Sequence, residues 1–171
     1  MKYVLVIVSF LLGAMLAVPL LSYLYKTGNI KHFGIENVRG EGEWKNLHRD
    51  GPWRFYFDND TLHSEGTYDM GTQIGKWTFY HPNGEKKSEG EFSDGLRSGH
   101  WIEWYENGRK REEGDYKEGR REGYWTFRHE NGQVESSGSY QDGKQIGEWY
   151  YHDEEGNQIG VLNYSKFNDA E

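Results

Sequence analysis

The sequence predicts an all-β protein, an elongated antiparallel β-meander of 24-residue hairpin repeats preceded by one N-terminal transmembrane helix. The main observation is a glycine followed two positions later by tryptophan, which recurs every 24 residues. These pairs are Gly51/Trp53, Gly75/Trp77, Gly99/Trp101, Gly123/Trp125 and Gly147/Trp149. An Asn-Gly turn signal follows three of the leading glycines at a fixed distance, and the chain opens on a long stretch without charge.

Each repeat is expected to form one β-hairpin, because half a period accommodates one strand and one tight turn. Turns are predicted at Asn83-Gly84 and Asp94-Gly95, where both residues of a two-residue turn would adopt positive φ values. Gly42 and Trp44 match the second half of the repeat. Half a repeat plus five repeats therefore give about eleven strands over residues 40–164.

The core is predicted from the register of these hairpins. If Asn83-Gly84 form the turn, Trp77 lies opposite Gly90, and the indole can lie across the neighbouring strand where no side chain stands. Side chains alternate along a strand, so Trp77 and Phe79 share one aromatic face of a single curled sheet and the other face is mostly charged. The predicted structural core consists of Trp53, Trp77, Trp101, Trp125, Trp149, Gly66, Gly90, Gly114 and Gly138.

Residues 1–25 are expected to form a transmembrane anchor or an uncleaved signal. No charged residue occurs from Tyr3 to Tyr25, and a helix of this length reaches about 34 Å, more than a hydrocarbon core of about 30 Å. A cleaved signal peptide is the alternative, but the best cleavage site has the bulky Met15 at its −3 position. Residues 26–39 are then a juxtamembrane linker and residues 165–171 a polar tail.

Charge bears on the location and on the partners. Basic residues flank the apolar segment on both sides, so the positive-inside rule leaves the orientation open. We expect a single-pass membrane protein with its repeat domain outside the cytoplasm, because a very short N-terminal tail suits a signal anchor that exports the rest of the chain. All 28 acidic residues lie beyond residue 25, and the net charge is −8. Such a surface repels phosphate groups, so we expect no nucleic acid partner.

The repeated pattern resembles that of MORN repeats. The segment from Gly42 to Asn46 and the run G-x-W-x-x-x-x-x-N-G…G-x-Y…G are most similar to bacterial MORN-variant repeats of the YwqK type, which are labelled as antitoxins. The resemblance covers about residues 40–164. It implies an elongated, curved β-meander that acts as a scaffold or protein-binding surface, and the antitoxin label implies a toxin as the partner.

A candidate binding stripe is predicted on the face opposite the tryptophans. Tyr56, Tyr80 and Trp104 occupy one repeat position there, and Lys87 and Arg111 are expected across the hairpin from Tyr80 and Trp104. Aromatic rings beside basic side chains are typical of surfaces that bind a protein or stack on a glycan. The alternative is that these cations only support the sheet's own rings.

Two functions are compatible with this stripe. The favoured function is a membrane-anchored, non-enzymatic scaffold that binds a protein partner through its sheet, with an antitoxin-like role as one form of it. The alternative is a cell-envelope carbohydrate-binding module that uses exposed aromatic residues, since the segment Gly147 to Tyr151 resembles the G-x-W-Y-Y core of cell-wall-binding repeats.

We expect no catalytic residue, no cofactor and no metal site. The chain has no cysteine, which excludes thiol nucleophiles and Cys-ligated zinc. His81 and His129 occupy equivalent positions two repeats apart, and Tyr105 holds this position between them. A shared metal would need ligands of one kind on neighbouring repeats, so the histidines are expected to be solvated or ring-stacked. The abundant carboxylates are expected to form a cross-strand charge lattice with lysine and arginine rather than calcium or glycosidase sites.

Overall fold

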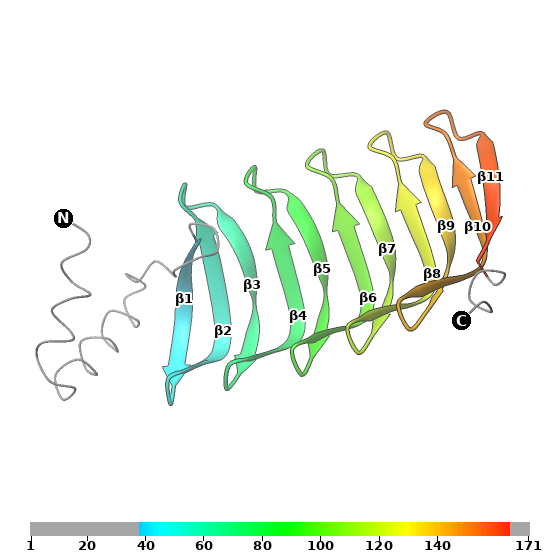
Figure 1. Cartoon of the computed structure of the whole chain (residues 1–171). Coiled ribbons are helices and arrows are strands. Elements are labelled where there is room, and N and C mark those ends of the chain that lie inside the picture. The colour runs from blue at the N-terminus through cyan, green and yellow to red at the C-terminus, as the bar shows by residue number, and fades with distance from the viewer. Residues whose placement is uncertain (1–37, 165–171) are drawn as a thin grey trace, which may run out of the picture.

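The computed structural model describes residues 38–164, which form one antiparallel sheet of eleven strands in chain order (Figure 1). The strands are β1 (Val38–Lys45), β2 (His48–Phe57), β3 (Leu62–Asp69), β4 (Thr72–Tyr80), β5 (Lys86–Ser93), β6 (Leu96–Trp104), β7 (Lys110–Lys117), β8 (Arg120–Arg128), β9 (Val134–Gln141), β10 (Lys144–His152) and β11 (Gln158–Asn163). The predicted β-meander of eleven strands is thereby confirmed. Its first strand begins at Val38, two residues before the expected start at residue 40.

Three predicted segments lie wholly or mostly outside the described residues: the anchor at residues 1–25, the linker at residues 26–39 and the tail at residues 165–171. Within residues 38–164 every regular element is a strand. This part of the chain accordingly contains no helix long and apolar enough to cross a membrane.

The two kinds of turn differ, and one of them corrects the prediction. Asp94 and Gly95 have φ values of 52° and 77°, which confirms a two-residue turn with two left-handed residues. Asn83 does not have a positive φ, whereas Gly84 has a φ of 89°. The Gly84 amide donates to the carbonyl oxygen of His81 at 2.9 Å. The loop is therefore a three-residue turn closed by a left-handed glycine.

The predicted register of β4 and β5 is correct although the loop between them is longer than predicted. Its additional residue is compensated by a β-bulge, which shifts the register between Phe79 and Tyr80. Beyond the bulge Trp77 pairs with Gly90 and Phe79 pairs with Ser88, as expected. Only the residues between the bulge and the loop are displaced from their predicted partners.

The tryptophans form the core, but each covers a glycine of the preceding strand and not the residue across its own hairpin. A β-carbon added to Gly90 would come closer than 3.0 Å to the Trp101 ring, so it is Trp101 of β6, and not Trp77 of β4, that lies over Gly90. The same relationship joins five pairs: Gly42/Trp53, Gly66/Trp77, Gly90/Trp101, Gly114/Trp125 and Gly138/Trp149. Each indole thus leans back onto the strand before its own hairpin.

A hydrogen bond fixes this direction. The Trp101 indole nitrogen donates to the backbone oxygen of Glu91 at 3.1 Å, and Glu91 lies where the β5–β6 register shifts. The same bond, to the residue after the covered glycine, recurs in all five pairs at 3.0 to 3.2 Å. The indole therefore satisfies its N–H donor on a backbone that it also shields from water.

Further rings and guanidinium groups enclose the tryptophans, which explains how a single-layer sheet buries them. Phe92 stands edge-on between Trp77 and Trp101, at 6.1 and 5.2 Å between ring centroids. The Arg97 guanidinium lies 4.2 Å from the centre of the Trp101 ring. Trp77, Trp101, Trp125 and Trp149 are each only 1% exposed. We call the side on which they lie the tryptophan face, and the opposite side the outer face.

Candidate binding surface on the outer face

The predicted stripe residues Tyr56, Tyr80 and Trp104 lie on the outer face, because each is an odd number of residues from a tryptophan of its own strand. All three are half-buried. The Arg39 guanidinium lies 5.0 Å from the centre of the Tyr56 ring. The Tyr80 hydroxyl donates to Glu65 at 3.0 Å; burial raises the pKa of this hydroxyl, and the bond to Glu65 adds to the rise. The stripe therefore has partners within the sheet.

The structure corrects the basic half of the stripe. Because of the bulge, Tyr80 pairs with Lys86 and Trp104 pairs with Lys110, one residue away from the predicted Lys87 and Arg111. The Lys86 ammonium lies 5.8 Å from the centre of the Trp104 ring. Lys87 and Arg111 therefore do not stand opposite the stripe.

Arg111 reaches the tryptophan face instead. It donates to Glu103 at 2.6 Å, and Glu103 lies two residues after Trp101 and hence on the same side of its strand. Lys87 holds the equivalent position one repeat earlier and is exposed. Period-2 counting fails for both residues because the bulge inserts one extra residue into the strand.

A row of glutamates runs along the middle of the outer face, at one repeat position. Glu65 accepts from Arg54 at 3.1 Å, and the other two, Glu89 and Glu113, each pair with two basic groups. The Lys86 ammonium, which donates to Glu89, holds the pKa of that carboxyl below its usual value. The hydrogen bond from Lys110 likewise lowers the pKa of Glu113, and Arg128 adds to this effect. This is the predicted cross-strand charge lattice.

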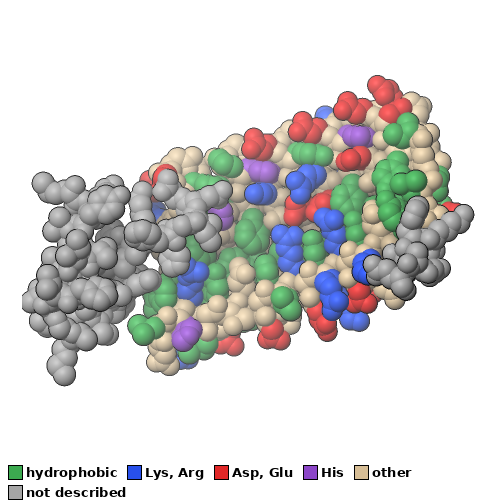
Figure 2. Space-filling view, viewed as in Figure 1, with side chains coloured by type: hydrophobic (Ala, Val, Ile, Leu, Met, Phe, Trp, Pro, Cys, Tyr) green, Lys and Arg blue, Asp and Glu red, His purple; other side chains and the backbone are tan. Residues whose placement is uncertain are grey.

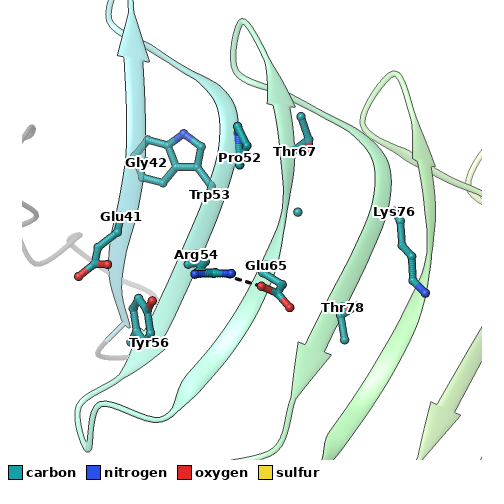
Figure 3. Close-up of a pocket in the computed structure, with 11 residues that line it drawn as sticks. Glu41, Gly42, Pro52, Trp53, Arg54, Tyr56, Glu65, Thr67, Lys76 and Thr78 are labelled. Atoms are coloured by element: carbon teal, nitrogen blue, oxygen red, sulfur yellow. Dashed lines mark hydrogen bonds and ion pairs between the residues drawn. The ribbon is translucent and has the colours of Figure 1, made fainter.

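The lattice borders an open hollow at the N-terminal end of the outer face (Figure 3). The hollow has a volume of about 770 Å³, and its lining includes the Arg54–Glu65 pair, Tyr56 and Lys76. Figure 3 shows these side chains projecting from neighbouring strands of the sheet. Within residues 38–164 no group of three or more histidine and acidic side chains is arranged to hold a metal ion. The lining of the hollow combines paired charges with the Tyr56 ring, and the buried Trp53 also borders it.

A charged cluster on the tryptophan face was not predicted from the sequence. Glu103 and Glu112 pair directly across β6 and β7, and Glu112 is only 7% exposed. Arg97 donates to Glu103 at 3.3 Å, and Arg121 donates to both oxygens of Glu112 at 2.9 Å. The available signal was a departure from the repeat: Glu103 and Glu112 occupy the positions that Phe79 and Ser88 hold one repeat earlier.

The histidines have a role that the prediction did not include. The ring nitrogen Nε2 of His81 donates to the backbone oxygen of Trp104 at 2.9 Å, and His129 donates in the same way to His152 at 3.0 Å. Tyr105, at the equivalent position between them, donates to Arg128 at 2.6 Å. These side chains join each repeat to the next, so the two histidines are structural links rather than merely solvated or ring-stacked side chains.

The space-filling view shows how the charges are distributed (Figure 2). On the face shown, basic and hydrophobic side chains are interspersed over the middle strands, while acidic side chains gather along both long edges. The edges are where the turns lie, and turn residues there include Asp94 and Asp142.

Comparison with known proteins gives one family. The family described as MORN repeat variant matches four tandem segments, at residues 49–70, 73–94, 97–118 and 121–142, which together make up just over half of the chain. Each segment spans one hairpin, from β2–β3 through β8–β9. No curated protein matches the chain.

Proposed function

Because this chain belongs to the MORN repeat variant family, we propose that it is a non-enzymatic scaffold that binds a protein partner on its sheet and is held at a membrane by its N-terminal segment. Repeats of this family are generally protein- or membrane-binding. The antitoxin label of similar repeats suggests a toxin as the partner, and affinity capture identifies the chain that is bound.

The observation that carries the proposal is the one-sided core. The five repeat tryptophans are buried on one face by glycines, rings and guanidinium groups of the same sheet. None of these rings belongs to the outer face. Residues of the outer face can therefore contact a partner without disturbing the core. A long sheet with aromatic and charged side chains at a regular spacing suits an extended protein surface better than a small substrate.

The membrane part of the proposal rests on the sequence. The stretch from Tyr3 to Tyr25 is long enough to span a bilayer and has no charge. We propose that it anchors the chain in the membrane and that the repeats lie outside the cytoplasm. A reporter enzyme active only outside the cytoplasm, fused after Glu171, tests the orientation: activity supports export, and a silent but folded fusion contradicts it.

The binding function is tested by affinity capture with the full-length chain in detergent. The double variant Tyr80→Ser/Trp104→Ser removes two rings of the stripe. Lys87→Ser/Arg111→Ser is the matched control, because these residues do not stand opposite the stripe. We expect the first variant to lose the captured protein and the control to retain it, with both still folded by circular dichroism.

Two results would contradict the proposal. A folded Tyr80→Ser/Trp104→Ser variant that captures the partner as the wild type does would show that the stripe is not used. Retention of the wild type on purified peptidoglycan or polysaccharide beads, without any captured protein, would favour the carbohydrate-binding alternative instead.

A further inference from the structure

We propose that the C-terminal end of the outer face, on β8, β10 and β11, binds an extended polypeptide segment that carries arginine or lysine. In this proposal the segment lies along the edge of β11 that has no neighbouring strand among the described residues, and it places its cation against Tyr124, Tyr150 and Glu148. The proposal rests on the proposed protein-binding function, and it names the chemistry of the partner and a second place where the partner binds.

The first observation is a change of composition along the outer face. The repeat position that holds Glu65, Glu89 and Glu113 in the first three hairpins holds Ser137 in β9 and Val161 in β11. The row of paired glutamates therefore ends after the third hairpin. An uncharged floor takes its place, with the small side chain of Ser137 directly between Thr126 and Tyr150.

The second observation is that the aromatic rings beside this floor are exposed. Tyr124 is 60% exposed and Tyr150 is 36% exposed. Two rings of the stripe, by contrast, each have a cation of the same chain over them: Arg39 lies over Tyr56, and Lys86 lies over Trp104. Within residues 38–164 no cation lies over the ring of Tyr124 or of Tyr150.

Glu148 completes the surface. It lies on the outer face beside Tyr150, whose hydroxyl donates to its carboxylate at 2.8 Å. This hydrogen bond raises the pKa of Tyr150, and Tyr124 is near enough to add to the rise. No basic group of the described chain pairs with Glu148, in contrast to Glu89 and Glu113. Two rings and a carboxylate without a cation form a site for a guanidinium or ammonium group.

The adjoining edge of the sheet indicates the shape of the partner. Among the described residues β11 has a neighbour on one side only. Val161 pairs with Tyr150, so this edge of β11 runs beside the site. An extended segment can add to such an edge through its backbone, while its side chains reach the neighbouring surface.

Leu162 excludes a further repeat, or a second copy of this chain stacked as a repeat, from that edge. Wherever one hairpin joins the next, the tryptophan of the following strand lies over a glycine. A β-carbon at that glycine would come closer than 3.0 Å to the ring, so only glycine fits there. Leu162 occupies this position in β11. The occupant must therefore be a strand without the tryptophan of the repeat. The net charge of −8 favours a basic one.

The test uses the full-length chain in detergent and a fluorescein-labelled octapeptide of alternating arginine and threonine, measured by fluorescence anisotropy. We expect Tyr124→Ser/Tyr150→Ser to weaken binding roughly tenfold and Glu148→Gln to weaken it about three- to fivefold. Glu135→Gln is the matched control, since it removes the same charge from an exposed position away from the site, and we expect its affinity to equal that of the wild type. A peptide with citrulline in place of arginine should bind at least tenfold more weakly, and one N-methylated at every second residue should also lose affinity.

The outcomes separate this proposal from its competitors. Equal weakening by Glu135→Gln and Glu148→Gln would show non-specific charge attraction and overturn the proposal, as would equal affinity for the citrulline peptide. A third outcome would also overturn the proposal: the wild type does not bind the peptide but is retained on polysaccharide beads, and Tyr124→Ser/Tyr150→Ser is not retained. This outcome would show that the surface binds a glycan. If the peptide site behaves as expected but Tyr80→Ser/Trp104→Ser still captures the partner, the proposed stripe fails and the C-terminal site stands.

Discussion

The ring of Trp101 lies directly over the backbone of Gly90, and the same indole donates to the backbone oxygen of Glu91. Glycine is required at this position for space, since it is the neighbouring ring and not the backbone angle of Gly90 that excludes a side chain. The repeat of 24 residues thus reflects one contact between consecutive hairpins. This contact allows a single-layer sheet to bury large rings.

Replacing the covered glycine should be costly. Gly90→Ala forces the Trp101 indole off the strand, and we expect the free energy of unfolding to fall by about 3 kcal/mol. Gly160→Ala is the control, because Gly160 lies in a strand with nothing near its added β-carbon, and we expect a change below about 0.5 kcal/mol. Denaturant unfolding followed by circular dichroism measures both. Similar losses in the two variants would mean that the ring does not exclude a side chain.

The position of a tryptophan in the array should matter although its burial does not differ. Trp101 and Trp149 are both 1% exposed, and truncation of either removes a buried ring at a cost of about 3–5 kcal/mol. Trp101→Ala breaks the contact between two flanking halves, whereas Trp149→Ala leaves four upstream hairpins intact. We expect the midpoint of denaturation of the main transition to fall further for Trp101→Ala. Identical unfolding curves would contradict nearest-neighbour stabilisation.

The glutamate lattice predicts a loss of stability in acid. The pKa of Glu113 is lower in the folded protein, chiefly because of Lys110, than the value of about 4.3 expected for an unfolded chain. Its contribution is therefore complete above about pH 5 and disappears as the pH falls through the folded pKa. We expect Glu113→Gln to reduce stability by about 1 kcal/mol at pH 7 and to have almost no effect at pH 3. Thermal unfolding between pH 3 and pH 7 provides the test, and Glu135→Gln should have little effect throughout this range.

The charged cluster on the tryptophan face should respond differently to one substitution and to two. Glu112→Ser leaves Arg121 without its carboxylate in a half-buried position, and we expect a loss of about 2–3 kcal/mol. Glu103→Phe/Glu112→Ser restores the residues of the preceding repeat and should recover most of that loss, because the new ring adds to the aromatic core. Chemical denaturation of the two variants decides this. A double variant less stable than Glu112→Ser would mean that the ion pairs are an essential part of the core.

Much of the fold could be predicted because the regular spacing of tryptophans, glycines and turns limits how neighbouring strands can pair. The pairing of Trp77 with Gly90 was derived from a two-residue turn at Asn83-Gly84, and it also holds with the three-residue turn because the bulge compensates for the additional loop residue. An inexact turn assignment therefore still gave the correct core register.

The stripe was only partly predictable for the same reason. Alternation holds through regular strand, so Tyr80 and Trp104 were placed on the correct face. It fails at a bulge, and Lys87 and Arg111 are the extra residues that the bulges insert, without a partner in the strand register. Bulges depend on the conformation of the loop that they adjoin, and the Asn-Gly pair is compatible with both turn types.

The direction in which each indole leans could not be obtained from the pattern. Trp77 has a glycine on either side of its strand, Gly66 and Gly90, and the sequence treats the two alike. The choice is made by the carbonyl oxygen that lies exposed where the register shifts, which accepts the indole N–H. That acceptor is a backbone oxygen, which every residue has, so the sequence does not reveal it.

Hydrogen exchange of the indole N–H groups tests the central claim most directly. Trp53, Trp77, Trp101, Trp125 and Trp149 each donate an indole hydrogen bond to the preceding strand. Trp104 is the internal reference, because its indole N–H makes no hydrogen bond within residues 38–164. Nuclear magnetic resonance of the ¹⁵N-labelled protein should show five indole signals that exchange at least about 100-fold more slowly than that of Trp104. Five signals that exchange as fast as Trp104 would contradict the packing of indoles over glycines.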